Sequence, residues 1–285
     1  MKKGLNVLSL FGGMECGRIA LDKAGILVDN YFSSEIDTAA ISVTKSNWPE
    51  IIHLGDIRNV YGGYISEPID LLIGGSPCQD ISNLNKNSKG LDGEKSGLFY
   101  EFLRLKNETN PKYFLLENVV GNKIAINEIT KLMGVEPILI DAAKVSGARR
   151  KRYFWTNIPN IEQPKDLGIT LEYSLLPTPD EKYFLSGGRL KWLLGESGKR
   201  CVAKKFASID PIKAQCLTAR SEPSWNCNYV TDRGRLRKLT PQEYEILQGV
   251  PINYTRCVDD IERYKMLGNG WNVDVITHIF KNIPQ

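Results

Sequence analysis

A cysteine that could act as a nucleophile, Cys78, follows the run DLLIGGSP at residues 70–77. An apolar run bounded by glycines predicts a buried strand of a parallel sheet, and the proline predicts a rigid loop after its carboxyl end. Open α/β sheets bind their ligands at that end. A buried cysteine more commonly packs as a small hydrophobic residue. Because Gln79, Asp80 and a polar run follow at once, we interpret Cys78 as a nucleophile.

A carboxylate and a basic cluster could act together with this thiol. Glu117 ends a second apolar run, and residues 149–152 are four consecutive basic residues. A thiolate can add to an electron-poor ring carbon while a carboxyl group supplies a proton to the ring nitrogen, which makes the adjacent carbon of a pyrimidine nucleophilic. A free cysteine, with a pKa of about 8.5, is mostly thiol at neutral pH, and the basic cluster could lower that pKa. The cluster alone would indicate a solvated turn, but the apolar run 153–155 follows it.

Groups that could bind a ligand also follow the first three strands that the pattern predicts. The run FGGMECG at 11–17 follows the first strand, Glu35 the second and Asp56 the third. The glycines allow close approach of a ligand, Glu35 could accept hydrogen bonds from ribose hydroxyls, and Asp56 could accept one from the exocyclic amine of adenine. These groups indicate an adenosine-containing cofactor. The glycine spacing is not GxGxxG and no Walker lysine is present, which disfavours NAD and ATP.

Strands alternate with helices through the first half of the chain. The hydrophobic pattern predicts strands at 5–11, 25–34, 51–54, 69–73, 113–116, 137–140 and 153–156, and helices near 18–23, 38–46, 98–105, 124–133, 241–248, 261–266 and 271–281. This order predicts an α/β fold with a doubly wound, mostly parallel sheet. Periodicity weakens after Pro159. We therefore expect a catalytic and cofactor-binding domain at 1–157, completed by 259–285, and a smaller, irregular target-recognition domain at 158–258. The polar run 83–97 predicts a closing lid.

Composition narrows the class of protein. The 285 residues are 42% hydrophobic and 25% charged, as in ordinary globular proteins. We expect no membrane span, no signal peptide and, with two histidines and no CxxC among six cysteines, no metal site. Reduced thiols predict a cytoplasmic protein. Residues 186–240 contain 12 Lys and Arg but only four Asp and Glu, which favours a polyanionic partner over a merely solvated face.

The motifs and their order along the chain resemble those of the cytosine-specific DNA methyltransferases that modify carbon 5 of the base. The matching segments are SLFxG at 9–13, Ser34-Glu35, GDIR at 55–58, GGSPCQDIS at 74–82, SGLF at 96–99, Glu117-Asn118-Val119, RxRY at 150–153, LTAR at 217–220 and GNG at 268–270. The pair formed by Pro77-Cys78-Gln79 and Glu117-Asn118-Val119 is the most specific. GGSPC at 74–78 and LGNxW at 267–271 look closer to the de novo eukaryotic-type branch.

The resemblance implies a role for each matching residue. Cys78 would attack carbon 6 of a flipped-out cytosine, Glu117 would protonate or hydrogen-bond ring nitrogen 3, and carbon 5 would take a methyl group from S-adenosylmethionine. Arg150 and Arg152 would hold the base. The cofactor would contact Phe11, Gly13, Met14, Glu35, Ile36, Asp56, Ile57, Gly75, Pro77, Leu98, Asn269 and Trp271. Double-stranded DNA would contact Ser82, Lys86, Lys89, Arg220, Arg233 and Arg235. From the position and charge of the predicted target domain, we expect residues 233–238 to contact phosphates and Ser224, Trp225, Asn226 and Asn228 to read bases.

The sequence departs from the family pattern at Ser9, at Glu15-Cys16 and at Ala148. None of these departures removes a group that does chemistry, so we expect an active enzyme. The short target domain predicts a short recognition sequence, and the chain fits a restriction-modification role near the nucleoid of a bacterial or phage-infected cell. Three alternatives stay open at this point: a transfer-RNA cytosine-5 methyltransferase of the same superfamily, a catalytically silent DNA-binding regulator, and a nicotinamide oxidoreductase.

Overall fold

The computed structural model describes residues 3–77, 97–219 and 227–284. The chain divides into two compact units, which are described separately. The sheet unit consists of Met1–Ile140, Lys151–Gln163 and Ile276–Gln285, and the second unit consists of Asp141–Arg150 and Pro164–Val275.

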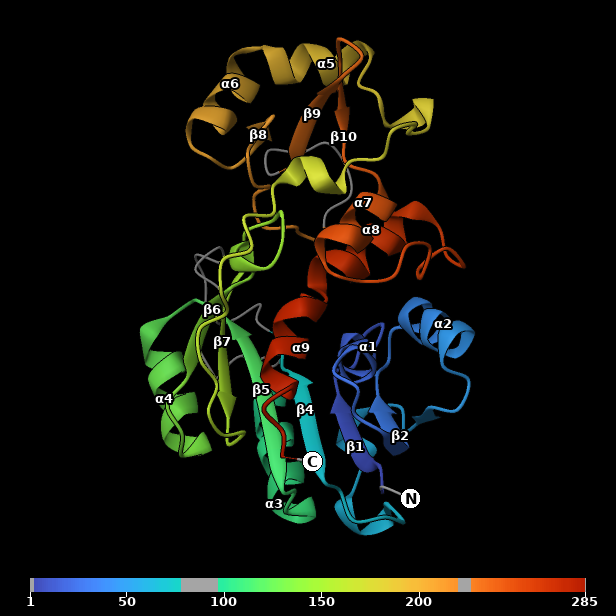
Figure 1. Cartoon of the computed structure of the whole chain (residues 1–285), viewed down its shortest axis with the longest axis vertical. Helices are drawn as coiled ribbons and strands as arrows, with labels where there is room; N and C mark the ends of the chain where they lie inside the picture. The colour runs from blue at the N-terminus through green and yellow to red at the C-terminus, as the bar shows by residue number, and fades with distance from the viewer. Residues whose placement is uncertain (1–2, 78–96, 220–226, 285) are drawn as a thin grey trace. The chain divides into compact units, whose positions relative to one another are not determined.

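A seven-stranded sheet forms the centre of the sheet unit, in the order β3-β2-β1-β4-β5-β7-β6 (Figure 1). Its strands are β1 (Leu5–Leu10), β2 (Val28–Ser34), β3 (Ile52–His53), β4 (Leu71–Gly75), β5 (Tyr113–Val119), β6 (Ile138–Asp141) and β7 (Lys151–Thr156). Strands β1 to β5 pair in parallel, and β7 runs antiparallel to β5. The predicted doubly wound, mostly parallel α/β sheet is therefore confirmed.

Helices connect these strands, as parallel pairing requires. They are α1 (Cys16–Lys23), α2 (Thr38–Asn47), α3 (Leu98–Thr109) and α4 (Lys123–Met133), with short 3-10 turns η1 (Ile57–Asn59) and η2 (Gly62–Tyr64) between β3 and β4. Helix α9 (Val273–Phe280) comes near the end of the chain, and its residues from Ile276 onward belong to this unit. Local sequence fixes their ends: Asp37 caps α2 by accepting the N–H groups of Ala39 and Ala40, and Gly134 ends α4 in the left-handed conformation.

The two faces of the sheet differ in chemistry because successive side chains of a strand point to opposite sides. On the α3–α4 face, Leu8, Leu72 and Leu116 pack with Phe102 and Ile129 in one hydrophobic cluster. The other face, which we call the Glu117 face, has the strand residues of opposite parity, including Ser9, Ser33, Glu117 and Arg152. In Figure 1, α9 crosses in front of β4 and β5, whereas α3 lies behind them. Two predicted catalytic residues, Glu117 and Arg152, therefore lie on the same face of the sheet.

The second unit contains a three-stranded sheet with helices. Its elements are η4 (Ala142–Lys144), η5 (Leu171–Ser174), η6 (Glu181–Tyr183), α5 (Gly187–Leu194), α6 (Glu196–Ala203), β8 (Ser208–Ile209), β9 (Asn228–Asp232), β10 (Arg235–Lys238), α7 (Pro241–Leu247) and α8 (Asp260–Asn269). Arg233 and Gly234, both with positive φ, form the two-residue hairpin turn that joins β9 to β10. The hydrophobic pattern did not predict α5, α6 or the hairpin, because these elements are short and α5 begins with two glycines.

Candidate active site

Strands β4 and β5 place the segment that leads into Pro77 beside Glu117 and Asn118. Gly75 at the end of β4 pairs directly with Glu117 on β5. The Asn118 amide donates to the carbonyl oxygen of Ser76 at 3.3 Å and to its hydroxyl at 3.1 Å. These contacts anchor the segment that leads into Pro77. Cys78, the next residue, lies outside the described residues.

An ion pair holds the carboxylate of Glu117. Arg152 Nε lies 2.8 Å from Glu117 Oε1, and the two side chains are 16% and 11% exposed. Their meeting follows from the register: Val119 pairs with Arg152 and Glu117 with Phe154, so Glu117 and Arg152 are diagonal neighbours on one face. The sheet therefore orients a nearly buried carboxylate and supplies the cation that compensates its charge.

The turn after β1 has an unusual backbone. Phe11, Gly13 and Glu15 have φ values of 57°, 56° and 61°, so every second residue is left-handed. A non-glycine residue in this region costs on the order of 1–3 kcal/mol unless its surroundings hold it there. A Cβ added to Gly13 would meet no described atom within 4 Å, so this backbone is open to close approach. Met14, by contrast, is buried at 1% exposure.

Glu35 lies against this turn. Its Oε2 accepts the Gly13 N–H at 2.8 Å, and its Oε1 accepts the N–H groups of Ile36 at 2.7 Å and Asp37 at 2.8 Å. The Ile36 side chain is 68% exposed beside it. The structure thus brings together three residues predicted to contact the cofactor: Gly13, Glu35 and Ile36.

The predicted adenine contact, Asp56, begins the short turn η1. Its carboxylate accepts the backbone N–H of Arg58 at 3.0 Å and pairs with the Arg58 guanidinium. Hydrogen bonds from the Arg58 side chain and backbone lower the pKa of Asp56 below its ordinary value. Ile57 is buried in the hydrophobic cluster of the α3–α4 face, and Leu98 packs against that cluster at the start of α3. Asp56 is therefore a half-buried carboxylate that stays charged at neutral pH.

Other predicted site residues belong to the second unit. The Arg150 guanidinium is buried there and donates to the carbonyl oxygens of Leu217, Gly268 and Asn269 at 3.1–3.3 Å. Arg150 thus fastens the backbone around Asn269, and its contact with a base stays a prediction. Trp271 follows in the same segment, after the end of α8.

Two predicted DNA contacts lie on the β9–β10 hairpin. Arg233 and Arg235 have side chains that are 61% and 49% exposed, and both lie over the Phe184 ring. Asn228, by contrast, is 2% exposed, and its amide bonds Ser208 and Gln215 of the same unit. The prediction that Asn228 reads bases is therefore wrong, because its polar atoms are used inside the unit. Ser82, Lys86, Lys89, Arg220, Ser224, Trp225 and Asn226, and the predicted lid before Gly97, lie outside the described residues.

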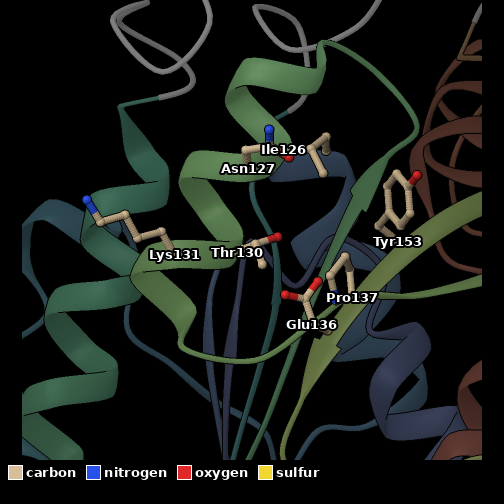
Figure 2. Close-up of a pocket in the computed structure, with 7 residues that line it drawn as sticks. All are labelled: Ile126, Asn127, Thr130, Lys131, Glu136, Pro137 and Tyr153. Atoms are coloured by element: carbon tan, nitrogen blue, oxygen red, sulfur yellow. The ribbon is translucent and has the colours of Figure 1, made fainter.

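A hollow of about 500 Å³ lies beside α4 (Figure 2). It is lined by Ile126, Asn127, Thr130, Lys131, Glu136, Pro137 and Tyr153. Tyr153 pairs with Asn118, so its side chain points away from the face that holds Glu117 and Arg152. The hollow is therefore separate from the ion pair, and no predicted catalytic residue lines it.

No cluster of three or more His, Cys, Asp or Glu side chains is arranged to hold a metal ion in the part of the chain that the structure describes. None of the helices within those ranges has the length and apolar character needed to cross a bilayer.

Sequence reasoning missed two residues that shape the site. Asn118 was noted only as part of a motif, yet its amide anchors Ser76. Glu15 was noted only as a departure from a pattern, yet it is completely buried beside the turn after β1. A charged residue directly after a glycine turn, with serines on the two neighbouring strands, was the available signal for Glu15.

Comparison with known proteins gives one family profile and several relatives. The profile described as "C-5 cytosine-specific DNA methylase" matches residues 5–130 and 150–285. Type II methyltransferase M1.ScrFI of Lactococcus lactis subsp. cremoris is 28% identical over 300 residues, covering 95% of this chain and 75% of the relative. Type II methyltransferase M.NgoPII of Neisseria gonorrhoeae is 27% identical over 331 residues, covering 96% and 94%.

Solved structures show the same fold. The Entamoeba histolytica methyltransferase EhMeth superposes with a TM-score of 0.81 at 18% identity, covering 100% of both chains. A Spodoptera frugiperda DNMT2 variant superposes with a TM-score of 0.76 at 21% identity, covering 98% of this chain and 99% of that one. At these identities the likeness speaks for the fold alone.

Proposed function

Because this chain belongs to the family of C-5 cytosine-specific DNA methylases, we propose that it is an active enzyme that methylates carbon 5 of cytosine in double-stranded DNA. The observation that carries the proposal is the ion pair between Glu117 and Arg152, in which Glu117 lies on β5, the strand next to the one that leads into Cys78. A carboxylate held by a cation beside a nucleophile is the arrangement that conjugate addition to a pyrimidine needs.

The chain's own groups account for the steps at the base. The Cys78 thiolate forms a bond to carbon 6, and Glu117 stabilises the electron density that arrives at ring nitrogen 3 by protonating or hydrogen-bonding it. Arg152 keeps the Glu117 carboxylate oriented through the 2.8 Å contact. After carbon 5 is methylated, its proton passes to solvent and the bond between Cys78 and carbon 6 breaks, which releases the thiolate and restores the aromatic ring. The base must first leave the helix stack, at a cost of a few kcal/mol.

The residues at the β1 turn fit an adenosine-containing methyl donor. Gly13 offers an open backbone, Glu35 a carboxylate for ribose hydroxyls and Ile36 an exposed apolar side chain. S-adenosylmethionine, the general cofactor of the family, supplies the methyl group when bound. We further propose that Asp56 accepts a hydrogen bond from the adenine amine, and that Met14, Ile57, Gly75, Pro77 and Leu98 of the sheet unit contact the cofactor. The contacts of Asn269 and Trp271 with the cofactor stay predictions.

Transfer of tritium from labelled S-adenosylmethionine tests this function. We expect incorporation into duplex DNA, none into transfer RNA, and loss of incorporation with Cys78→Ser. Glu117→Gln should lower kcat by about 10²- to 10⁴-fold, the usual contribution of a positioned acid or base. Glu136→Gln, which changes the same residue type at the hollow on the other face, should leave kcat unchanged.

Each alternative gives a different result in the same assay. Labelling of transfer RNA in place of DNA would identify the RNA-directed enzyme. Binding of DNA without labelling, with Cys78→Ser indistinguishable from the parent, would identify a silent regulator. Bisulfite sequencing of plasmid DNA from cells that express the active protein would then give the recognition sequence.

A further inference from the structure

The turn after β1, which we assign to cofactor binding, packs against the buried carboxyl group of Glu15. The proposed chemistry does not use this carboxyl group. Glu15 has no exposed surface, and its carboxylate accepts hydrogen bonds from Ser9 Oγ at 2.9 Å, Tyr31 Oη at 2.7 Å and Ser33 Oγ at 2.5 Å. Within the described ranges, no Lys, Arg or His forms an ion pair with it. Three neutral hydroxyls therefore hold a carboxyl group in the interior.

The sheet explains why three hydroxyls converge there. Ser9 on β1 pairs directly with Ser33 on β2, and Tyr31 precedes Ser33 by two residues, so all three point to the Glu117 face. Glu15 lies at the N-cap of α1 with φ 61°, and its carboxyl group lies against Gly12 of the preceding turn. Two strands and the start of a helix thus build the pocket for this one carboxyl group.

Contacts lead from this carboxyl group to the cofactor-binding backbone. A Cβ on Gly12 would lie 1.8 Å from Glu15 Oε1, so the Gly12 backbone rests directly on the acid. The next N–H, that of Gly13, donates to Glu35 Oε2 at 2.8 Å. The buried acid, the left-handed turn and the candidate ribose acceptor therefore form one connected set.

We propose that Glu15 is a positioning residue for S-adenosylmethionine: its buried carboxyl group holds the turn 11–15 in its left-handed form before the cofactor arrives, so that Gly13 and Glu35 are already placed. This inference rests on the proposed cofactor site. A turn held in its binding conformation loses little freedom on binding, which strengthens affinity without any contact between Glu15 and the ligand.

Calorimetric binding of S-adenosylmethionine and steady-state kinetics on duplex DNA test the inference. Glu15→Ala should raise the Kd and the cofactor KM by about tenfold or more, while kcat at saturating cofactor stays within about twofold, because the reacting groups are untouched. Glu15→Gln and Tyr31→Phe, which keep the packing and change one hydrogen-bonding group each, should give smaller increases of the same kind. Glu50→Gln, at an exposed acid of the same unit, should bind like the parent.

Glu15→Gly separates the effect of losing the carboxyl group from the effect of strain in the left-handed backbone. Glycine adopts φ 61° freely, so this variant loses the carboxyl group but no longer resists the left-handed form. We expect it to bind the cofactor about threefold to tenfold more tightly than Glu15→Ala. A role confined to packing predicts the reverse order, since glycine leaves the larger void.

The outcomes distinguish this inference from the proposed function. Binding by Glu15→Gln, Tyr31→Phe and Glu15→Ala within twofold of the parent, or an equal loss of kcat and kcat/KM, would overturn the positioning role while leaving the methyltransferase intact. If Glu15→Ala does not fold, cofactor binding by Glu15→Gln and Tyr31→Phe still tests the positioning role. A parent protein that binds no S-adenosylmethionine would instead overturn the proposed cofactor site, and the positioning role with it.

Discussion

Fully buried glutamates occur in both units, and the two units treat them differently. In the second unit, Glu243 contacts Arg237 at 2.8 Å and Glu245 contacts Arg263 at 3.2 Å. In the sheet unit, Glu15 has only hydroxyl donors among the described residues. A basic partner compensates the charge of a buried carboxylate, whereas burial without such a partner raises the pKa of the carboxyl group.

Glu243 shows what the paired arrangement does. It forms a capping box with Thr240 at the start of α7 and accepts the backbone N–H of Leu176 at 2.8 Å. Arg237 also contacts Asp232 at 2.8 Å. One acid therefore joins β10, α7 and the segment after η5. Glu15 instead fixes a single turn that we assign to ligand binding, so the unpaired acid is the one next to a candidate site.

The largest effect is expected from breaking the pairing in the second unit. Arg237→Met leaves Glu243 buried without its cation, which should lower the free energy of unfolding by about 3–5 kcal/mol. Urea denaturation followed by tryptophan fluorescence would measure it. The double variant Arg237→Met/Glu243→Gln should recover part of the loss, since no buried charge remains. Equal loss in the single and double variants would show that charge pairing is not what stabilises this unit.

A smaller effect, which depends on pH, is expected at Glu15. Burial raises the pKa of its carboxyl group above the ordinary value of 4.5, outweighing the hydrogen bonds from Ser33, Tyr31 and Ser9, while the nearby charge of Glu35 raises it further. The folded state therefore keeps a proton that the unfolded chain loses near pH 4.5. Stability from this group is complete below pH 4.5 and falls as pH rises through the raised pKa.

Glu15→Gln removes this titration. The parent should therefore lose stability relative to Glu15→Gln as pH rises above 4.5, by about 1.4 kcal/mol for each unit by which the pKa is raised, and the difference should then level off. Thermal melts of both proteins across pH 4–9 would measure it. The other ionisable groups near this carboxyl group, Tyr31, Glu35 and Arg18, are the same in both proteins. A difference that does not change with pH would show that the pKa of Glu15 is the same in the folded and unfolded states.

The smallest effect on stability is expected at the exposed end of the β9–β10 hairpin. Arg235 pairs with Glu181 in solvent and lies over Phe184, two residues before the buried Arg237. Arg235→Ala should leave the urea midpoint unchanged, because exposed pairs contribute little. It should weaken DNA binding equally across sequences and reduce the slope of log K against log salt by about 0.9. An unchanged salt slope would remove Arg235 from the predicted phosphate contacts.

The contrast between Arg235 and Arg237 also shows where sequence reasoning stops. Both belong to the basic run that was expected to contact phosphates, and nothing local distinguishes them. Burial separates them, because Arg237 is 1% exposed between Asp232 and Glu243. Asn228 was assigned to base reading from its position in the same segment, and it is likewise buried. Whether such a polar side chain is buried depends on the residues that other helices and strands place around it. The local sequence pattern does not show which residues these are.

The sequence by itself determined the alternation of strands and helices, and with it a parallel sheet whose carboxyl ends gather Gly13, Glu35, Asp56 and Glu117, because hydrophobic period and glycine placement are local properties. Only the tertiary structure decided that Arg152 faces Glu117, that Arg150 binds backbone carbonyls, and that Glu15 meets three hydroxyls. Those facts depend on strand register and on which elements pack together, and register is set by the whole sheet.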